Sequence, residues 1–76
     1  MSISQETARI IFALNLRRQM TVSDLNQADL ARYAGVTQAA ICRYCAGHRL
    51  PRADTLARMA KALGCSSSAL LKGLAD

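Results

Sequence analysis

The stretch QADLARYAGVTQAAICRYCA, residues 27–46, decides how this chain folds. Its first half is amphipathic and ends at Gly35, the residue type that most readily ends a helix in the left-handed conformation. A second amphipathic segment follows, in which Ile41 and Tyr44 return to one side at helical spacing. Ala31 is small enough to let two helices touch closely. The stretch therefore predicts two short helices joined by a tight turn.

Two helices joined in this way form a helix-turn-helix, and in that motif the second helix enters the major groove of DNA. The spacing predicts the motif over about residues 27–46, with a recognition helix over about residues 38–46. The side chains that this second helix leaves exposed would then determine what the protein binds.

Length and composition bound the rest of the fold. The chain has 76 residues, enough for one small domain over residues 1–76, and 51% of them are apolar, which argues against disorder. Ala and Leu dominate and aromatic residues make up 4%, which favours helix over sheet. No apolar run is long enough to span a membrane, no secretory signal is evident, and three cysteines suggest no disulfide framework. We therefore expect an all-α protein of the cytoplasm.

Helical spacing predicts three more helices around the motif. The first covers about residues 4–19, with one side made of Ile10, Ile11, Leu14 and Arg18. Thr, Ser and Asp cluster in residues 21–25, which predicts a loop there. The fourth helix covers about residues 53–63, with an apolar stripe of Leu56, Met59, Ala60 and Leu63. A short fifth helix is capped by Ser66 and stops at Gly73.

The charge is unevenly distributed along the chain. Ten Lys and Arg residues face five acids, for a formal net charge of +5. Between residues 30 and 53 the chain carries four arginines and one histidine and no acid. Such a one-sign stretch suits a polyanion, and arginine suits phosphate and guanine better than lysine does. The alternative is a basic face that is merely solvated.

Four short motifs occur in a recognisable order. They are NQADLA at residues 26–31, GVTQ at residues 35–38, Gly47 with Pro51 four residues later, and LARMAKALGCS at residues 56–66. In this order and spacing the chain resembles the Cro/CI family of helix-turn-helix proteins over about residues 10–73, most closely the DNA-binding domains of lambdoid-phage repressors. The resemblance implies a compact five-helix, lambda-repressor-like domain. It also implies a phage or prophage-type repressor that binds a palindromic operator as a dimer.

The chain departs from the family pattern at two places. The loop before Gln27 looks about two residues longer than in relatives. Cys45 stands where the family often has a Glu that pairs with an arginine of the first helix, here corresponding to Arg18. Burying an unpaired arginine is costly, so we expect Arg18 to lean to solvent or to find another acceptor.

The second helix of the motif offers the candidate base contacts. Ile41 and Tyr44 point inward by periodicity, which leaves outward-facing side chains that include Gln38, Ala39, Cys42 and Arg43. Glutamine can bond bidentately to adenine and arginine to guanine, and a small alanine can touch a thymine methyl. We expect Gln38 and Arg43 to be the principal readers, and by resemblance both match family positions of this kind. The alternative is that either contacts only phosphate.

Phosphate contacts are expected from residues around this helix. By resemblance, Asn26 and Gln27 match phosphate-contact positions, and Gln27 begins a helix whose N-terminus favours an anion. Thr37 could add a hydroxyl, although a capping role explains it equally well. The remaining candidates are His48, Arg49 and Arg52, in and beside the loop at Pro51, with plain surface charge as the alternative for the arginines.

The cysteines and the histidine do not predict a metal or catalytic site. Cys42, Cys45 and His48 have a spacing that invites a zinc interpretation, but both cysteines fall inside a helix whose sides already have roles. Small buried hydrophobic residues at Cys45 and Cys65, with Cys42 exposed, explain them better. No nucleophile and carboxylate are placed credibly beside His48. We therefore expect no enzyme, no metal and no cofactor.

The expected partner is double-stranded DNA, bound by a homodimer that can be weak without DNA and does not act at a membrane. The fifth helix, with Leu70 and Leu71, is the expected dimer contact, unless Leu70 belongs to the core and Leu71 is only half-exposed. Such a regulator would work at the nucleoid of a bacterial cell or a phage-infected host. The alternative function is an antitoxin-like interaction module that binds a protein partner and regulates its own gene only secondarily.

Overall fold

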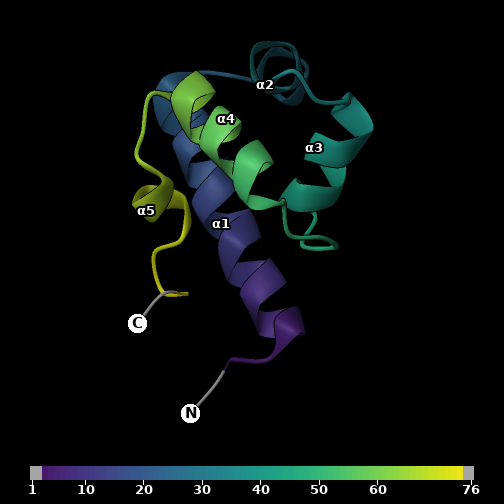
Figure 1. Ribbon diagram of the computed structural model, residues 1–76, viewed down its shortest axis with the longest axis vertical. Helices are drawn as coiled ribbons and strands as arrows, with labels where there is room; N and C mark the ends of the chain where they lie inside the picture. Colours follow the sequence, from purple (N-terminus) through teal and green to yellow (C-terminus); the bar gives the residue numbers. More distant parts are fainter. Residues whose placement is uncertain (1–2, 75–76) are drawn as a thin grey trace.

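The computed structural model describes residues 3–74 and arranges them around one long helix (Figure 1). In chain order its helices are α1 (Gln5–Ser23), α2 (Gln27–Ala34), α3 (Gln38–Cys45), α4 (Ala53–Leu63) and α5 (Ser67–Leu70). Residues 3–74 contain no strand. The predicted all-α, five-helix architecture is confirmed. No helix in this part of the chain combines the length and apolar character needed to cross a bilayer.

Local side-chain chemistry sets the helix boundaries. The N-caps of α1, α2, α3 and α5 each accept a hydrogen bond from the backbone N–H three residues later, and they are Ser4, Asn26, Thr37 and Ser66. These bonds satisfy N–H groups that the first turn of a helix leaves free. Gly35 and Gly64 end α2 and α4 in the left-handed region, with φ of 70° at both.

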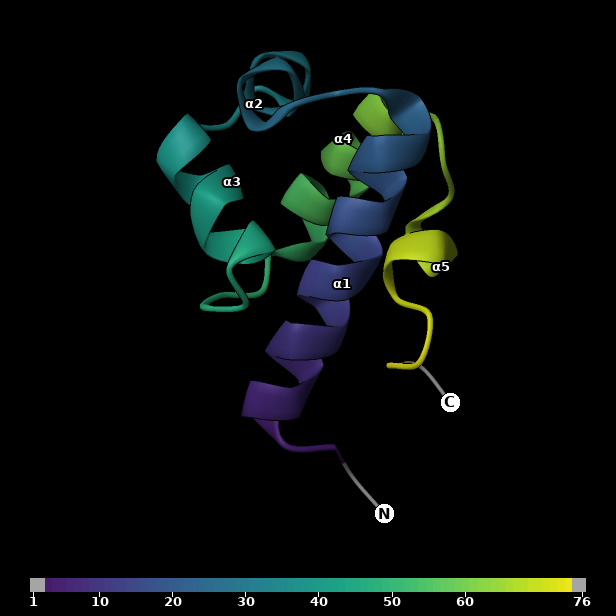
Figure 2. The same ribbon diagram turned by 180° about the vertical axis from the view of Figure 1, so that it is seen from behind.

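The core lies where the other helices meet the middle and the C-terminal half of α1. Helix α1 contacts α3, α4 and α5, and α2 packs against α3 and α4. Every helix supplies at least one large side chain that is completely buried: Phe12, Leu16, Leu30, Ile41, Met59 and Leu70. The first turns of α1 extend beyond this cluster, as both views show (Figures 1 and 2).

The side of α1 that faces the core differs from the prediction. Its buried residues are Phe12, Ala13, Leu16 and Met20, whereas Ile10 and Leu14 are about half exposed and Arg18 is exposed. Helix α1 has apolar side chains at helical spacing on two sides, so periodicity alone admits two orientations. The neighbouring helices cover only one of these sides.

The C-terminal end of α1 also differs from the prediction. The helix continues through the segment expected to be a loop and stops only at Asp24, which adopts the left-handed conformation with φ of 57°. The hydroxyl of Thr21 donates to the Arg17 carbonyl at 3.0 Å, and that of Ser23 donates to the Gln19 carbonyl at 2.8 Å. Bonded in this way to the preceding turn, these residues do not interrupt the helix. The expected extra loop length before Gln27 is therefore additional helix.

Helix α5 is shorter than predicted, because it ends at Leu70 rather than near Gly73. The segment after it is fastened to α1 by the side-chain amide of Asn15. That amide donates to the carbonyls of Leu70 and Lys72, both at 2.9 Å. Gly73 continues along the same side, where a Cβ would stand 3.6 Å from the Ile11 side chain. Residues 70–73 therefore lie alongside the middle of α1.

Candidate nucleic-acid interface

Helix α3 has one buried side and one exposed side. Ile41 is completely buried and Tyr44 and Cys45 nearly so, which attaches the helix to α1 and α2. The exposed residues are Gln38, Ala39, Cys42, Arg43 and Ala46 at the C-cap. The outer side of α3 thus presents an amide and a guanidinium among small side chains, a combination that can reach into the major groove without steric obstruction.

The turn between α2 and α3 holds the two helices in fixed relation. Gly35 takes the left-handed conformation, and the backbone N–H of Val36 returns to the Ala31 carbonyl at 3.0 Å. Thr37 then caps α3, its hydroxyl oxygen accepting from the Ala40 N–H at 3.1 Å. This bond uses Thr37 as an acceptor, and its hydroxyl hydrogen remains available to donate to a phosphate.

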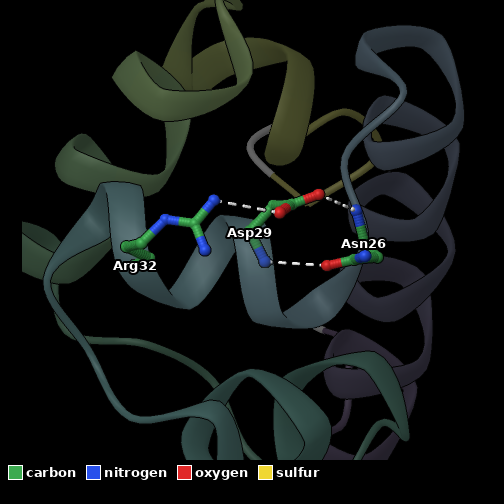
Figure 3. A network of polar contacts seen from close by, with 3 residues as sticks. All are labelled: Asn26, Asp29 and Arg32. Carbon is green, nitrogen blue, oxygen red and sulfur yellow. Dashed lines mark hydrogen bonds and ion pairs between the residues drawn. The ribbon is translucent and has the colours of Figure 1, made fainter.

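A polar network organises the N-terminus of α2 (Figure 3). The Asn26 side chain accepts from the Asp29 N–H at 2.8 Å, and the Asp29 carboxylate accepts from the Asn26 N–H at 3.3 Å, which completes a capping box. The guanidinium of Arg32 donates to the same carboxylate at 3.1 Å. Asp29 is thereby partly neutralised, so a carboxylate at this helix end repels an approaching phosphate less strongly.

Arg32 is held by a second contact on its other side. Its guanidinium carbon lies 5.0 Å from the centre of the Tyr33 ring, within cation–π range. Tyr33, and after it Asp29, raises the pKa of Arg32. Arg32 therefore adds an exposed positive charge on α2.

The loop after α3 carries the other predicted phosphate contacts. His48 and Arg49 are exposed, as is Arg52, whose Nε lies 3.4 Å from Oδ1 of Asp54. The Arg52 side chain is 86% exposed, so solvent screens this ion pair and Arg52 can exchange Asp54 for another anion. Gly47 begins the loop with φ of 76°, a conformation that suits glycine.

The sequence model of the helix-turn-helix family matches residues 16–70, well over half of the chain. The chain belongs to the helix-turn-helix family. Within that family, α2 and α3 are the two helices of the motif. This membership supports a DNA-binding transcription regulator, and the predicted Cro/CI-type resemblance is confirmed.

Solved structures give a second comparison. The fold is similar to that of the restriction-modification controller protein C.AhdI from Aeromonas hydrophila, with a TM-score of 0.78. The two sequences are 24% identical, and the match covers 82% of this chain and 94% of the other. At this identity the likeness shows the fold alone. No curated protein sequence matches the chain significantly.

A groove beside the helix-turn-helix contains an arginine that sequence reasoning missed. The groove has a volume of about 520 Å³, and its lining includes Arg17, Asn26, Gln27 and Cys45. Arg17 is exposed and close enough to Cys45 for its positive charge to act on that thiol. It therefore places a cation beside the two predicted phosphate contacts of α2. The helical spacing of Phe12, Leu16 and Met20 is the sequence signal that could have predicted Arg17 on the flank of α1 near α3.

The structure places Arg17, and not Arg18 as expected, beside Cys45. Arg18 lies on the opposite flank, in a shallow hollow shared with Asn15 and Lys72, whereas Arg17 is the residue beside Cys45. Arg18 is exposed, in agreement with the expectation that it leans to solvent. Within residues 3–74 the ion pairs are Arg32–Asp29 and Arg52–Asp54, so neither Arg17 nor Arg18 has a carboxylate partner there. Arg17 takes this place because α1 turns Phe12, Leu16 and Met20 toward the core, and not the predicted side.

Cys45 has a different partner. Its thiol donates to the sulfur of Met20 at 3.7 Å inside the core. Burial raises the pKa of Cys45, although the charge of Arg17 opposes the shift, and burial also raises the pKa of Cys65. Both residues therefore remain thiols at neutral pH, which is unfavourable for a metal ligand. Residues 3–74 contain no cluster of three or more His, Cys, Asp or Glu side chains that could hold a metal ion.

The structure corrects one of the two residues predicted to form the dimer contact. Leu70 is completely buried within its own chain, so its side chain cannot meet a second copy. Leu71 is half-buried and keeps part of its surface exposed. Leu70 is therefore a core residue, and Leu71 alone remains a candidate contact on this segment.

Proposed function

We propose that this protein is a sequence-specific repressor that binds a palindromic operator as a homodimer, with α3 of each copy in the major groove. The observation that carries the proposal is the outer side of α3. It exposes Gln38 and Arg43 within a stretch, residues 30–53, that contains no acidic residue. A groove lined by phosphates selects for such a surface, because each cation releases condensed counterions when it meets the DNA backbone.

Two side chains carry the base readout in this proposal. Gln38 bonds to an adenine and Arg43 to a guanine, each through two hydrogen bonds to the base edge. Ala39 and Cys42 lie on the same exposed side and make the apolar contacts with thymine methyl groups. Sequence preference at each half-site comes from these four positions.

The remaining contacts position the protein on the duplex. Asn26, Gln27 and Thr37 approach one phosphate segment near the N-terminal ends of α2 and α3. His48, Arg49 and Arg52 approach the backbone from the loop after α3. Arg17 joins the first group, because it lines the groove next to Asn26 and Gln27. A protein of this kind acts at the nucleoid, where its operator lies.

Selection of bound sequences from random duplex DNA tests the proposal. We expect a palindrome whose half-sites are centred about one helical turn, roughly 34–36 Å, apart. The variant Gln38→Ala with Arg43→Ala serves as the matched control, and it should enrich no palindrome while keeping its fold by circular dichroism. If the unaltered protein enriches no sequence, the repressor proposal is wrong and an antitoxin-like interaction module becomes the better explanation.

A further inference from the structure

Within residues 3–74, two apolar side chains on the outward side of α1 stay about half exposed, although the loop at Gly47 lies close to one of them, Ile10. Ile10 and Leu14, one helical turn apart, are 49% and 55% exposed. Ile3, just before the helix, is also exposed. Figure 2 shows α1 in front of α4, with α3 on one flank and α5 on the other and no ribbon crossing in front of α1. Unlike scattered surface leucines, these residues form a stripe on one side of the longest helix.

The homodimer of the proposed function needs more surface than α5 can supply. A specific interface buries about 800 Å² on each partner. Helix α5 has four residues, and Leu70, its largest apolar side chain, is completely buried. The 19 residues of α1 extend for about 28 Å and offer a second apolar surface directly beside residues 70–73.

The charges along α1 indicate what covers it. Glu6 and Arg17 are eleven residues apart, close to three helical turns, so they lie on the same flank of the apolar stripe. Both are exposed. In an antiparallel pair of α1 helices whose two-fold axis passes level with Phe12, Ile10 of one copy meets Leu14 of the other. Glu6 then lies within about one residue rise of Arg17 of the second copy, on the same flank.

We propose that α1 pairs with α1 of a second copy in this antiparallel arrangement. The stripe of Ile10 and Leu14 forms the centre, and two symmetric Glu6–Arg17 ion pairs form the edge. Because a guanidinium has five N–H donors, Arg17 can pair with Glu6 of the second copy and still donate to a phosphate. A parallel arrangement would instead place each charge level with its own equivalent. The proposal rests on the homodimer of the proposed function and names its interface.

This pairing also suits the proposed DNA-binding role. A two-fold axis perpendicular to two antiparallel helices keeps corresponding flanks on the same side of the pair. Helix α3 lies on the flank of Arg17, which shares a groove with Cys45. Both copies of α3 are therefore on one face of the dimer, as simultaneous contact with one side of a DNA duplex requires.

Sedimentation equilibrium without DNA tests the interface, over about 10 µM to 1 mM protein because a contact of this size is weak. We expect a monomer–dimer equilibrium that Leu14→Asp weakens at least about tenfold, because each copy would bury an unpaired charge at the centre. The matched control is Val22→Asp, which changes an apolar residue of α1 that is 75% exposed and lies off the stripe. It should dimerise as the unaltered protein does.

A charge exchange tests the antiparallel register. Glu6→Arg and Arg17→Glu should each weaken dimerisation about fivefold to tenfold, since both symmetric pairs become repulsive. The double variant should recover to within about twofold of the unaltered protein, a rescue that a merely structural role for either residue would not give. Thermal unfolding checks that every variant is folded.

Three results would overturn the proposal. An unaltered protein that stays monomeric over the whole concentration range excludes a second copy as the occupant of this face. Full dimerisation of folded Leu14→Asp excludes the stripe, and absence of rescue in the double variant excludes the antiparallel register. Because no DNA is present, these failures are separable from failure to select an operator, which concerns α3.

Discussion

At the scale of single residues, the proposed readout depends on the side chains that α3 leaves outside. Gln38 and Arg43 are exposed, while Ile41 and Tyr44 between and beside them are buried. The exposed pair can therefore be changed with little effect on packing. This separation makes substitutions on the outer side of α3 informative about binding rather than stability.

Replacing Arg43 with alanine should remove discrimination at one base pair of each half-site. A bidentate arginine–guanine contact contributes about 1–3 kcal/mol of discrimination, and its loss should make the four base pairs at that position nearly equivalent. Affinities for a panel of single-base operator variants measure this. Arg49→Ala is the control, and it should weaken all operators alike. If Arg43→Ala also weakens all operators alike, Arg43 contacts phosphate and does not read a base.

The buried thiol of Cys45 should lower the free energy of unfolding in alkaline solution. Its folded pKa is raised by burial, so the folded state holds the thiol proton more tightly than the unfolded chain does. This contribution is fully present below the ordinary thiol pKa of 9.0 and is lost as pH rises through the higher folded value. Urea unfolding from pH 7 to pH 10 should show a smaller decline for Cys45→Ala than for Cys42→Ala, whose residue is exposed. Equal declines would contradict the assignment.

At the scale of secondary-structure elements, α2 and α3 behave as local units and α1 does not. The capping box at Asn26, the turn at Gly35 and the cap at Thr37 are each made by residues within three or four positions of one another. Helix α1 instead receives its buried side from contacts with α3, α4 and α5, which are distant in sequence. The orientation of α1 consequently depends on the tertiary contacts and can be tested by mutation.

Phe12→Ala and Leu14→Ala distinguish the two possible orientations of α1. Phe12 is completely buried, so its truncation should lower the free energy of unfolding by about 3–5 kcal/mol. Leu14 is 55% exposed, and its truncation should change that free energy by only about 0.5 kcal/mol. Chemical denaturation at low protein concentration, where any dimer dissociates, measures both. The reverse order of effects would mean that the predicted stripe, and not the observed one, faces the core.

At the scale of the whole molecule, the helix-turn-helix and the elements next to it carry several exposed arginines. Arg17 comes from α1, Arg32 from α2 and Arg49 from the loop after α3, and all three are exposed. They contribute to a formal net charge of +5, which favours a polyanion as the partner. A surface of this kind makes affinity depend strongly on ionic strength.

Operator affinity should fall steeply with salt. A dimer that makes about 6–10 phosphate contacts should lose about a thousandfold or more in affinity between about 50 and 200 mM monovalent salt. Arg17→Ala should reduce the slope of log affinity against log salt by about two, one contact for each copy. Arg18→Ala is the matched control, because Arg18 lies on the opposite flank of α1 and should leave the slope unchanged. An unchanged slope in Arg17→Ala would remove Arg17 from the contact set.

Local sequence signals were enough to place the five helices, apart from the C-terminal ends of α1 and α5, and to identify the outward side of the motif. Caps such as Asn26 and Thr37 and the end at Gly35 act on backbone groups within one turn, and the spacing of Ile41 and Tyr44 admits a single buried side for α3. Packing between helices that are distant in sequence sets the orientation of α1 and thereby places Arg17, not Arg18, beside Cys45. Such packing also buries Leu70 in the core. Helix α1 is apolar on two sides, so local periodicity is satisfied either way. Contacts with helices distant in sequence choose the side with Phe12, Leu16 and Met20 and leave Ile10 and Leu14 about half exposed.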